Sequence, residues 1–408
     1  MKTTLTRIAT AVSLAFACTA GAADITLTQN GTGDTATLTQ NNAVASKIGV
    51  NQSGNGDTAT VTQQNNSSSY PATATVSQTG NSNTSTIQQL LSYAAKASVT
   101  QNGDSNTAAV TQKNGGTGYA DNAQGIVTQS GNNNLATINQ TGTNTGGGVT
   151  NDGIGNGASA IINQVYQYGS AATINQTGIS LRTRAEINQN INDQGNTVSF
   201  GNAKATATVN QAGNDHAAKI YQQTSGGIAN VTQSGNGQSA NVTQEVMRDG
   251  TATTNQSGSL NNATITQRGT IANLLAGAMM ATSEATITQN GTGNTASATQ
   301  TNSRNLVSIT QTGTSHSATT SQGGTDGRIV ITQNGSPQTA TANQSAGAFN
   351  ESNIIQSGAS QTATANQSGV GTGAAHNLIL ISQSGASSHS ASVTQSGGAG
   401  NKASIVQN

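Results

Sequence analysis

Glutamine is the residue whose type and spacing stand out in this chain, and its side-chain chemistry is hydrogen bonding. Pairs of glutamines recur with an interval of eleven residues, beginning with Gln29 and Gln40. A primary amide has two N–H donors and a carbonyl acceptor, so amides repeated at a fixed interval can bond to one another in a column. The candidate ladder residues are Gln29, Gln40, Gln52, Gln63, Gln101, Gln112, Gln233, Gln244, Gln256, Gln267, Gln289, Gln300, Gln311 and Gln333.

The groups that usually carry catalysis or bind metals show no comparable pattern. His216 and His316 each lie five residues after a glutamine but several repeats apart, so we expect them to line turns rather than share a metal. Carboxylates are scattered singly, and no serine stands in a fixed order with a histidine and an aspartate. The sequence therefore predicts no enzyme, no cofactor and no small-molecule substrate.

The composition excludes an ordinary globular core. Only 7% of the residues are charged and 2% are aromatic, with no tryptophan. Fixing one backbone residue costs about 1–2 kcal/mol, whereas burying one large apolar side chain returns only about 1.5–3 kcal/mol. The 14 basic residues are balanced by 14 acidic ones, which leaves no basic patch for nucleic acid. A near-neutral chain rich in Asn and Gln favours thin, hydrogen-bonded β-assembly instead.

Strands with one buried face are the elements that must position the glutamines. In Ala263–Gln267, apolar or Gln residues alternate with threonines, which predicts that Ala263, Ile265 and Gln267 point inward. Glycine recurs two residues after the first glutamine of each pair, for example Gly54 after Gln52, where a turn needs positive φ. Each unit therefore forms one strand–turn–strand rung.

The rungs repeat every 22 or 23 residues, as from Gln29 to Gln52 and from Gln311 to Gln333. A single rung cannot satisfy its backbone or its buried amides, so its stability must come from neighbouring rungs. Stacking places each glutamine about 4.7–4.9 Å from the next. We predict an all-β fold, a β-solenoid of about sixteen stacked rungs covering residues 23–408.

The N-terminal segment has the pattern of a secretory signal peptide. Lys2 and Arg7 precede a short apolar run from Ile8 to Ala17, and Ala20–Ala22 has the small-x-small form of a cleavage site. Cleavage after Ala22 would remove the only cysteine, Cys18. We therefore assign residues 1–22 to a leader and expect a secreted, cysteine-free mature chain.

The repeat resembles the curlin repeat of curli, the amyloid fibres of bacterial biofilms. The segments that carry the resemblance are Gln289–Gln300 and Gln101–Gln112, which share Gln-x-Gly-x-x-Asn-x-Ala and a closing glutamine. The resemblance implies a fimbria-like or pilus-like fibre subunit on the bacterial surface that serves cell adhesion and biofilm matrix. It also implies two partners, a nucleator subunit and an outer-membrane export channel.

The chain departs from the family pattern in several places. Family subunits carry a non-repetitive segment after the leader, whereas here the first predicted strand begins at Ile25. Asn151 stands where a first glutamine belongs, and the eleven-residue interval is lost over residues 176–211. An apolar insertion, Ile271–Met280, interrupts another repeat, and we interpret it as an extra strand or short helix that covers the stack.

Outward threonines leave a second function open. The pairs Thr37/Thr39 and Thr264/Thr266 would form flat Thr-x-Thr ladders that suit an ice-binding solenoid. Ala109 interrupts these ladders. A third reading is the passenger domain of a larger surface adhesin.

The two ends of the predicted stack show no protective cap. The first strand, Ile25–Gln29, contains Leu27, and the last, Ala403–Gln407, contains Ile405. Soluble solenoids usually protect their ends with atypical repeats, and other proteins protect exposed sheet edges with charges or prolines. We therefore expect Leu27 and Ile405 to mark the interface of a head-to-tail homopolymer, in which the chain's main partner is itself.

Overall fold

A computed structural model describes most of the chain. It covers residues 2–6, 11–17, 24–43, 45–65, 71–91, 94–114, 123–142, 158–178, 183–190, 204–269 and 282–408. The chain divides into two compact units, each described below by itself. The first comprises Met1–Asn192 with Asn202–Ala217, and the second comprises Asp193–Gly201 with Ala218–Asn408.

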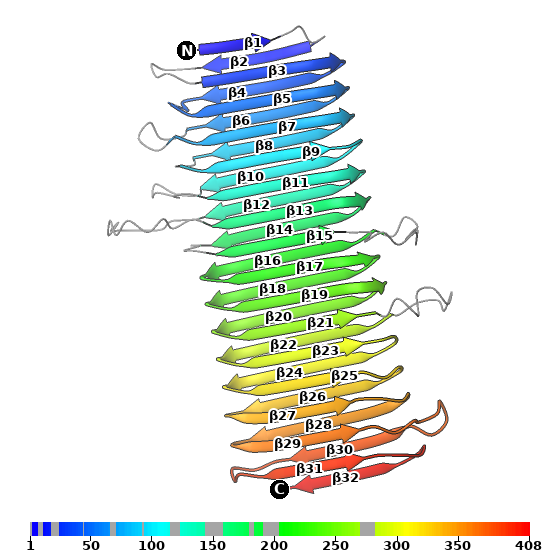
Figure 1. Cartoon of the computed structure of the whole chain (residues 1–408). Helices are drawn as coiled ribbons and strands as arrows, with labels where there is room; N and C mark the ends of the chain where they lie inside the picture. Colours follow the sequence, from blue (N-terminus) through cyan, green and yellow to red (C-terminus); the bar gives the residue numbers. More distant parts are fainter. Residues whose placement is uncertain are drawn as a thin grey trace. The chain divides into compact units, whose positions relative to one another are not determined.

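The first unit contains sixteen strands, two in each rung (Figure 1). The strands are β1 (Lys2–Thr6), β2 (Ala11–Ala17), β3 (Asp24–Thr32), β4 (Thr35–Asn41), β5 (Lys47–Asn55), β6 (Thr58–Gln64), β7 (Thr73–Asn81), β8 (Thr84–Leu90), β9 (Lys96–Asn102), β10 (Thr107–Asn114), β11 (Gln124–Asn132), β12 (Leu135–Gly142), β13 (Ser159–Tyr168), β14 (Ala171–Gly178), β15 (Arg184–Asn190) and β16 (Thr206–Asn214). Odd-numbered strands form one parallel sheet and even-numbered strands form the other, each strand pairing with the strand two places along.

The second unit repeats this arrangement with strands β17 to β32. The strands are β17 (Ala217–Ser225), β18 (Ile228–Asn236), β19 (Ser239–Arg248), β20 (Thr251–Ser259), β21 (Asn262–Arg268), β22 (Glu284–Thr292), β23 (Thr295–Thr301), β24 (Leu306–Thr314), β25 (Ser317–Gln322), β26 (Arg328–Gly335), β27 (Gln338–Gln344), β28 (Asn350–Gly358), β29 (Gln361–Gln367), β30 (Asn377–Gln383), β31 (Ser390–Gln395) and β32 (Lys402–Gln407). Every regular element in the described residues is a strand, and the predicted β-solenoid is confirmed.

The pairing register places equivalent positions of successive repeats on top of one another. Between β3 and β5, Leu27 lies opposite Val50 and Gln29 lies opposite Gln52. Between β22 and β24, Gln289 lies opposite Gln311 in the same way. A shift of one residue would move every inward side chain to the outer face, so the repeating Ile/Val-x-Gln pattern fixes the register.

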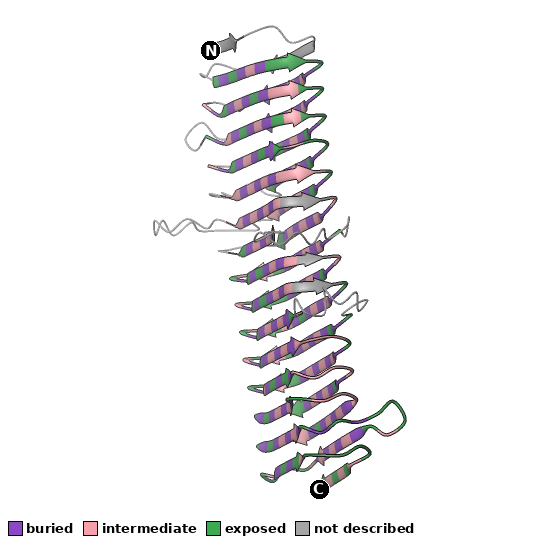
Figure 2. Ribbon diagram, turned by 45° about the vertical axis from the view of Figure 1, so that its right-hand side comes forward, coloured by how far each residue is buried: buried purple, intermediate pink, exposed green. Residues whose placement is uncertain are grey.

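The core is the thin layer between the two sheets of each unit. Buried and partly exposed residues alternate along the strands (Figure 2). In β21, Ala263, Ile265 and Gln267 are buried while the threonines between them are partly exposed, which confirms the predicted faces. The inward positions hold mainly Ala, Ile, Val and Gln. Because these side chains are small and aligned, the core is thin and depends on stacking rather than on bulk.

Glycine is required where one rung turns closely above the next. Gly80 has a φ of 120°, and a Cβ added there would lie 2.1 Å from the carbonyl oxygen of Gly103. A side chain at this position would therefore force neighbouring turns apart. Gly49, in the middle of β5, has no such restriction, since its added Cβ would lie 3.6 Å from Thr75 Cγ2.

The tight glycine turn follows odd-numbered strands in the earlier part of the chain and even-numbered strands in the later part. From β3 to β14 it follows odd-numbered strands, as at Gly33 between β3 and β4. From β16 onward it follows even-numbered strands, as at Gly237 between β18 and β19. The change takes place across residues 176–211, the stretch in which the eleven-residue interval is lost. The insertion Ile271–Met280 and the predicted leader cleavage site lie outside the described residues.

Among the described residues, no helix is long and apolar enough to cross a membrane.

Candidate functional site

The glutamines form continuous hydrogen-bonded ladders inside each unit. In the first unit, Nε2 of Gln29 donates to Oε1 of Gln52 at 2.7 Å, and Gln52 donates to Gln78 at 2.9 Å. In the second unit, Gln244 donates to Gln267 and Gln267 donates to Gln300, both at 2.8 Å. These side chains are almost completely buried. Stacking therefore satisfies amides that would be costly to bury alone.

In ladder amides such as those of Gln52 and Gln63, the second N–H ties the two sheets of a unit together. Gln52 of β5 also donates to the carbonyl oxygen of Thr35 at the start of β4, at 3.2 Å. Gln63 of β6 donates to the carbonyl oxygen of Lys47 at the start of β5, at 3.1 Å. One side chain thus holds its own ladder and the backbone of the facing sheet, which spaces the sheets.

The structure places all fourteen predicted ladder glutamines in these columns. In the first unit, odd-numbered strands carry Gln29, Gln52 and Gln101, and even-numbered strands carry Gln40, Gln63 and Gln112. In the second unit, odd-numbered strands carry Gln244, Gln267 and Gln300. Even-numbered strands there carry Gln233, Gln256, Gln289, Gln311 and Gln333.

Sequence spacing missed ladder members in the irregular part of the first unit. Gln164 accepts from Gln129 at 2.9 Å and donates to Gln189 at 2.8 Å. Gln164 therefore holds the ladder position that we expected for Asn151, which lies outside the described residues. Gln176 continues the other ladder by donating to Gln211 at 2.9 Å. The signal that identifies these residues is the local Ile-Asn-Gln triplet, not the distance to the previous glutamine.

The ladders have a direction. In the glutamine–glutamine bonds of the described rungs, Nε2 of the earlier residue donates to Oε1 of the later one. At the N-terminal end, Oε1 of Gln29 and Oε1 of Gln40 are buried and accept no hydrogen bond from the described residues. At the C-terminal end, Nε2 of Gln395 donates to Leu378 O at 3.0 Å and Nε2 of Gln407 donates to Ser390 O at 3.2 Å. Each of those two amides has a second N–H, for which no acceptor lies among the described residues.

The last rung is less covered than the rungs inside the stack. Ala403, Ile405 and Gln407 occupy inward positions of β32 but are only half-buried, and Val406 is 63% exposed. Leu27 at the other end is 1% exposed, because β3 pairs with β1 in the full chain. The predicted end residues therefore lie in unlike surroundings.

Backbone bond directions show which end groups face outward. The N–H of Asp24 points to the next rung, where it donates to Ser46 O at 3.3 Å. Since directions alternate along a strand, the N–H of Leu27 points to the N-terminal side. At the other end, the N–H of Leu378 in β30 donates to Asn401 O at 2.8 Å. By the same alternation, the N–H of Ile405 points toward β30 and the N–H of Ser404 points toward the open edge. Ser404, rather than Ile405, carries an outward donor.

A second column of polar side chains fills the tight turns. Asn83 donates through its backbone N–H and its Nδ2 to Oδ1 of Asp57, at 2.9 and 3.2 Å, and its Nδ2 also donates to Gly103 O at 2.7 Å. The carboxylate of Asp57 has no N–H to donate as Asn83 Nδ2 does, and its Oδ2 is buried without a partner among the described residues. Burial raises the pKa of the Asp57 carboxyl, and the neighbouring Asp34 raises it further.

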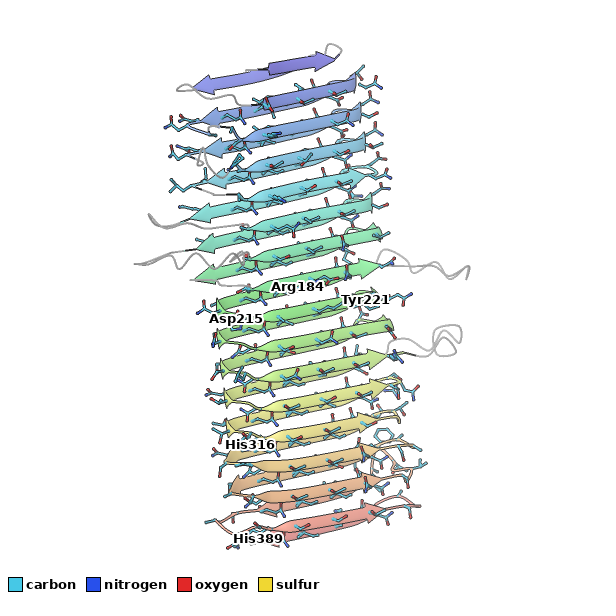
Figure 3. All side chains as sticks on the ribbon, turned by 60° about the vertical axis from the view of Figure 1, so that its left-hand side comes forward. Arg184, Asp215, Tyr221, His316 and His389 are labelled. Carbon is cyan, nitrogen blue, oxygen red and sulfur yellow. The ribbon has the colours of Figure 1, made fainter. Side chains whose placement is uncertain are left out.

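His216 lies between β16 and β17, and His316 lies between β24 and β25 (Figure 3 labels His316), so each histidine lines a turn as expected. Nε2 of His316 lies 3.0 Å from Thr312 O, and its backbone N–H donates to Oδ1 of Asn294 at 3.0 Å. Burial lowers the pKa of both imidazoles. In the described part of the chain, no three His, Cys, Asp or Glu side chains gather as a metal site would require.

The outward threonines of the first unit align across several rungs. Thr37 lies opposite Thr60, and Thr60 lies opposite Thr86. Ala109 follows in this column, and Thr137 continues it. The face is thus a threonine array with a gap, built on the even-numbered strands.

Comparison with known proteins identifies the repeat. Residues 283–313 and 303–335 match the family model of the curlin associated repeat. The matched residues span β22 to β26 of the second unit. No curated protein sequence is similar enough to the chain to be matched with it.

Proposed function

The chain is a curlin-repeat protein, and from that premise we propose that it is a structural subunit of extracellular curli-like fibres. In this proposal it is not an enzyme, and the fibre serves cell adhesion and the biofilm matrix. The leader directs residues 23–408 out of the cell, and the assembled fibre lies on the bacterial surface. A nucleator subunit and an outer-membrane export channel are the partners that the family implies.

The observation that carries this proposal is the polarity of the glutamine ladders. The C-terminal rung has unused N–H groups on Gln395 and Gln407, and the N-terminal rung has unused acceptors on Gln29 and Gln40. The last two strands, β31 and β32, belong to the odd and the even sheet, as β3 and β4 do. A second copy therefore continues both sheets when its β3 lies over β31 and its β4 lies over β32. Gln395 then donates to Gln29 of the next copy, and Gln407 donates to Gln40.

Such a contact joins two different surfaces of the same chain. A head-to-tail interface of this kind does not close on itself, so it generates a filament. In residues 23–408, where the strands of the leader are absent, the same contact pairs the backbone edges of β3 and β4 with those of β31 and β32, as in a cross-β stack. Each added copy therefore presents a new C-terminal or N-terminal rung to the next one.

The deciding experiment uses purified residues 23–408 without added partners. We expect fibres whose diffraction has a strong reflection near 4.7–4.8 Å along the fibre axis. A chain that stays monomeric at high concentration, or that forms aggregates without this reflection, would overturn the proposal.

The aligned threonines favour one second candidate, an ice-binding solenoid. Thr37, Thr60 and Thr86 present hydroxyl and methyl groups at the strand spacing. The measurement is thermal hysteresis of the soluble chain. Hysteresis from a monomer that never forms fibres would place this function above the first.

A further inference from the structure

The leader forms a rung of its own on the N-terminal end of the first unit. β1 pairs in parallel with β3, with Leu5 opposite Leu27, and β2 pairs in parallel with β4, with Leu14 opposite Leu38 (Figure 1). These are the backbone edges that a second copy would need in the proposed fibre. Before cleavage, the growth face is therefore already paired.

The leader rung covers this edge without continuing the ladders. Neither β1 nor β2 contains an Asn or Gln. β1 ends opposite Thr28, one residue before Gln29, and β2 places Phe16 opposite Gln40. This register explains why the two glutamine acceptors, Oε1 of Gln29 and of Gln40, have no partner among the described residues although both are buried.

We infer that the uncleaved leader is a capping rung that blocks the N-terminal growth face, an inference that rests on the proposed head-to-tail fibre. Atypical terminal repeats protect solenoid ends in this way. Removal of the leader exposes the edges of β3 and β4 together with two amide acceptors. Cleavage thereby couples export to polymerisation.

The cap has a directional consequence. An uncleaved chain keeps its C-terminal face open, so it can dock through β31 and β32 onto the N-terminal face of a fibre. Its own N-terminal face is closed, so that end of the fibre stops. The opposite end, which offers a C-terminal face, cannot accept an uncleaved chain.

The test compares chains 1–408 and 23–408 as monomers added to preformed fibres of 23–408. We expect the shorter chain to elongate both ends, and the full chain to elongate neither. A substoichiometric amount of full chain, mixed with the shorter chain, should stop growth at one end only when single fibres are imaged. Equal elongation by the two chains, or inhibition of both ends alike, would overturn the inference.

A variant of the full chain separates capping from simple misfolding. Prolines at Thr4, Leu5, Ser13 and Leu14 remove two consecutive backbone N–H groups from each leader strand. Because N–H directions alternate along a strand, one N–H of each pair points toward β3 or β4, and its hydrogen bond is lost. This variant should elongate fibres as the shorter chain does. Alanine at the same four positions keeps the N–H groups and should still cap. If the proline variant remains inactive, the leader acts by another route and the inference fails.

The outcomes also separate this inference from the proposed function. Failure of 23–408 to form fibres counts against the fibre itself. Fibres from 23–408 that full-length chains extend equally well count against the cap alone.

Discussion

The backbone N–H of Asp57 donates to Oδ1 of Asp34 at 3.0 Å, and both side chains are fully buried in adjacent tight turns. In the rungs that follow, Asn83 and Asn106 fill this position and Asn106 donates from Nδ2 to Asn83 at 3.2 Å. The two aspartates therefore place acceptor atoms where the column requires a donor. They lie in the turns that follow β3 and β5, next to the proposed growth face.

Replacing Asp57 with Asn should stabilise these rungs at neutral pH. The amide supplies the missing donor, and a buried unsatisfied group costs about 1–3 kcal/mol. The measurement is amide hydrogen-exchange protection of residues 24–65 in fibres. Asp104→Asn is the matched control, since Asp104 is exposed. Unchanged protection in Asp57→Asn would contradict the expected cost of the unsatisfied Asp57 carboxylate.

The pH dependence at Asp57 has a definite sign. Its pKa is raised above the ordinary value of 3.8 in the folded state, so the folded chain binds the proton more tightly than the unfolded chain does. Stability of these rungs should therefore rise as the pH falls from neutral toward 4, and Asp57→Asn should lose this dependence. Protection that falls on acidification in the wild type but not in the variant would reverse the assignment.

His316 should respond to acid in the opposite direction. Its pKa is lowered below 6.5 by burial, so the unfolded chain binds the proton more tightly. Stability around residues 306–335 should be lost as the pH falls through about 6.5. His316→Asn should remove this loss, whereas His376→Asn, at an exposed position, should not. Hydrogen exchange at pH 7 and pH 5 measures both.

A ladder glutamine should tolerate leucine better than lysine. Gln244 accepts from Gln222, donates to Gln267, and also bonds to Gly250 O at 2.9 Å. Gln244→Leu leaves these partners unsatisfied, at about 1–3 kcal/mol. Gln244→Lys adds a buried unpaired charge, at about 3–5 kcal/mol. Fibre yield should fall in the order wild type, leucine, lysine; equal yields from the two variants would contradict an inward Gln244.

The sequence predicts the fold well because side-chain alternation and repeat spacing are local properties. Alternation in Ala263–Gln267 identifies the inner face, and stacking of identical slots follows from it. The interval between glutamines is less informative, since loops of any length can leave the stack between two strands. Gln164 joins the ladder across a connection of 35 residues from Gln129, which no fixed spacing would find.

The backbone direction at the ends is a second feature that the sequence does not carry. Alternation shows that Leu27 and Ile405 both point inward, and on that basis both are predicted as end residues. It does not show whether a residue's N–H faces the rung before or the rung after. That direction depends on which residues of the strand donate to the next rung, and the backbone hydrogen bonds of Asp24 and Leu378 reveal it.

Gly80, at the tight turn, should not tolerate alanine, whereas Gly49, in the middle of β5, should tolerate it. Gly80→Ala forces a side chain into positive φ, which costs about 1–3 kcal/mol, and places Cβ 2.1 Å from Gly103 O. Gly49→Ala meets ordinary contact distances. Circular dichroism and fibre yield should therefore fall for the first variant only. Normal assembly of Gly80→Ala would contradict the close approach of adjacent turns.

Prolines at the two open edges should stop polymerisation without unfolding the chain. The N–H groups of Leu27 and Ser404 point away from the stack, so Leu27→Pro and Ser404→Pro in residues 23–408 remove edge donors and keep the bonds to β5 and β30. The double variant should remain soluble with β-rich circular dichroism and should not elongate wild-type fibres. Ile405→Pro is the matched control, because it breaks a bond to β30 and should fray the last rung as seen by hydrogen exchange. If the double variant elongates fibres at the wild-type rate, the terminal rungs are not the assembly interface.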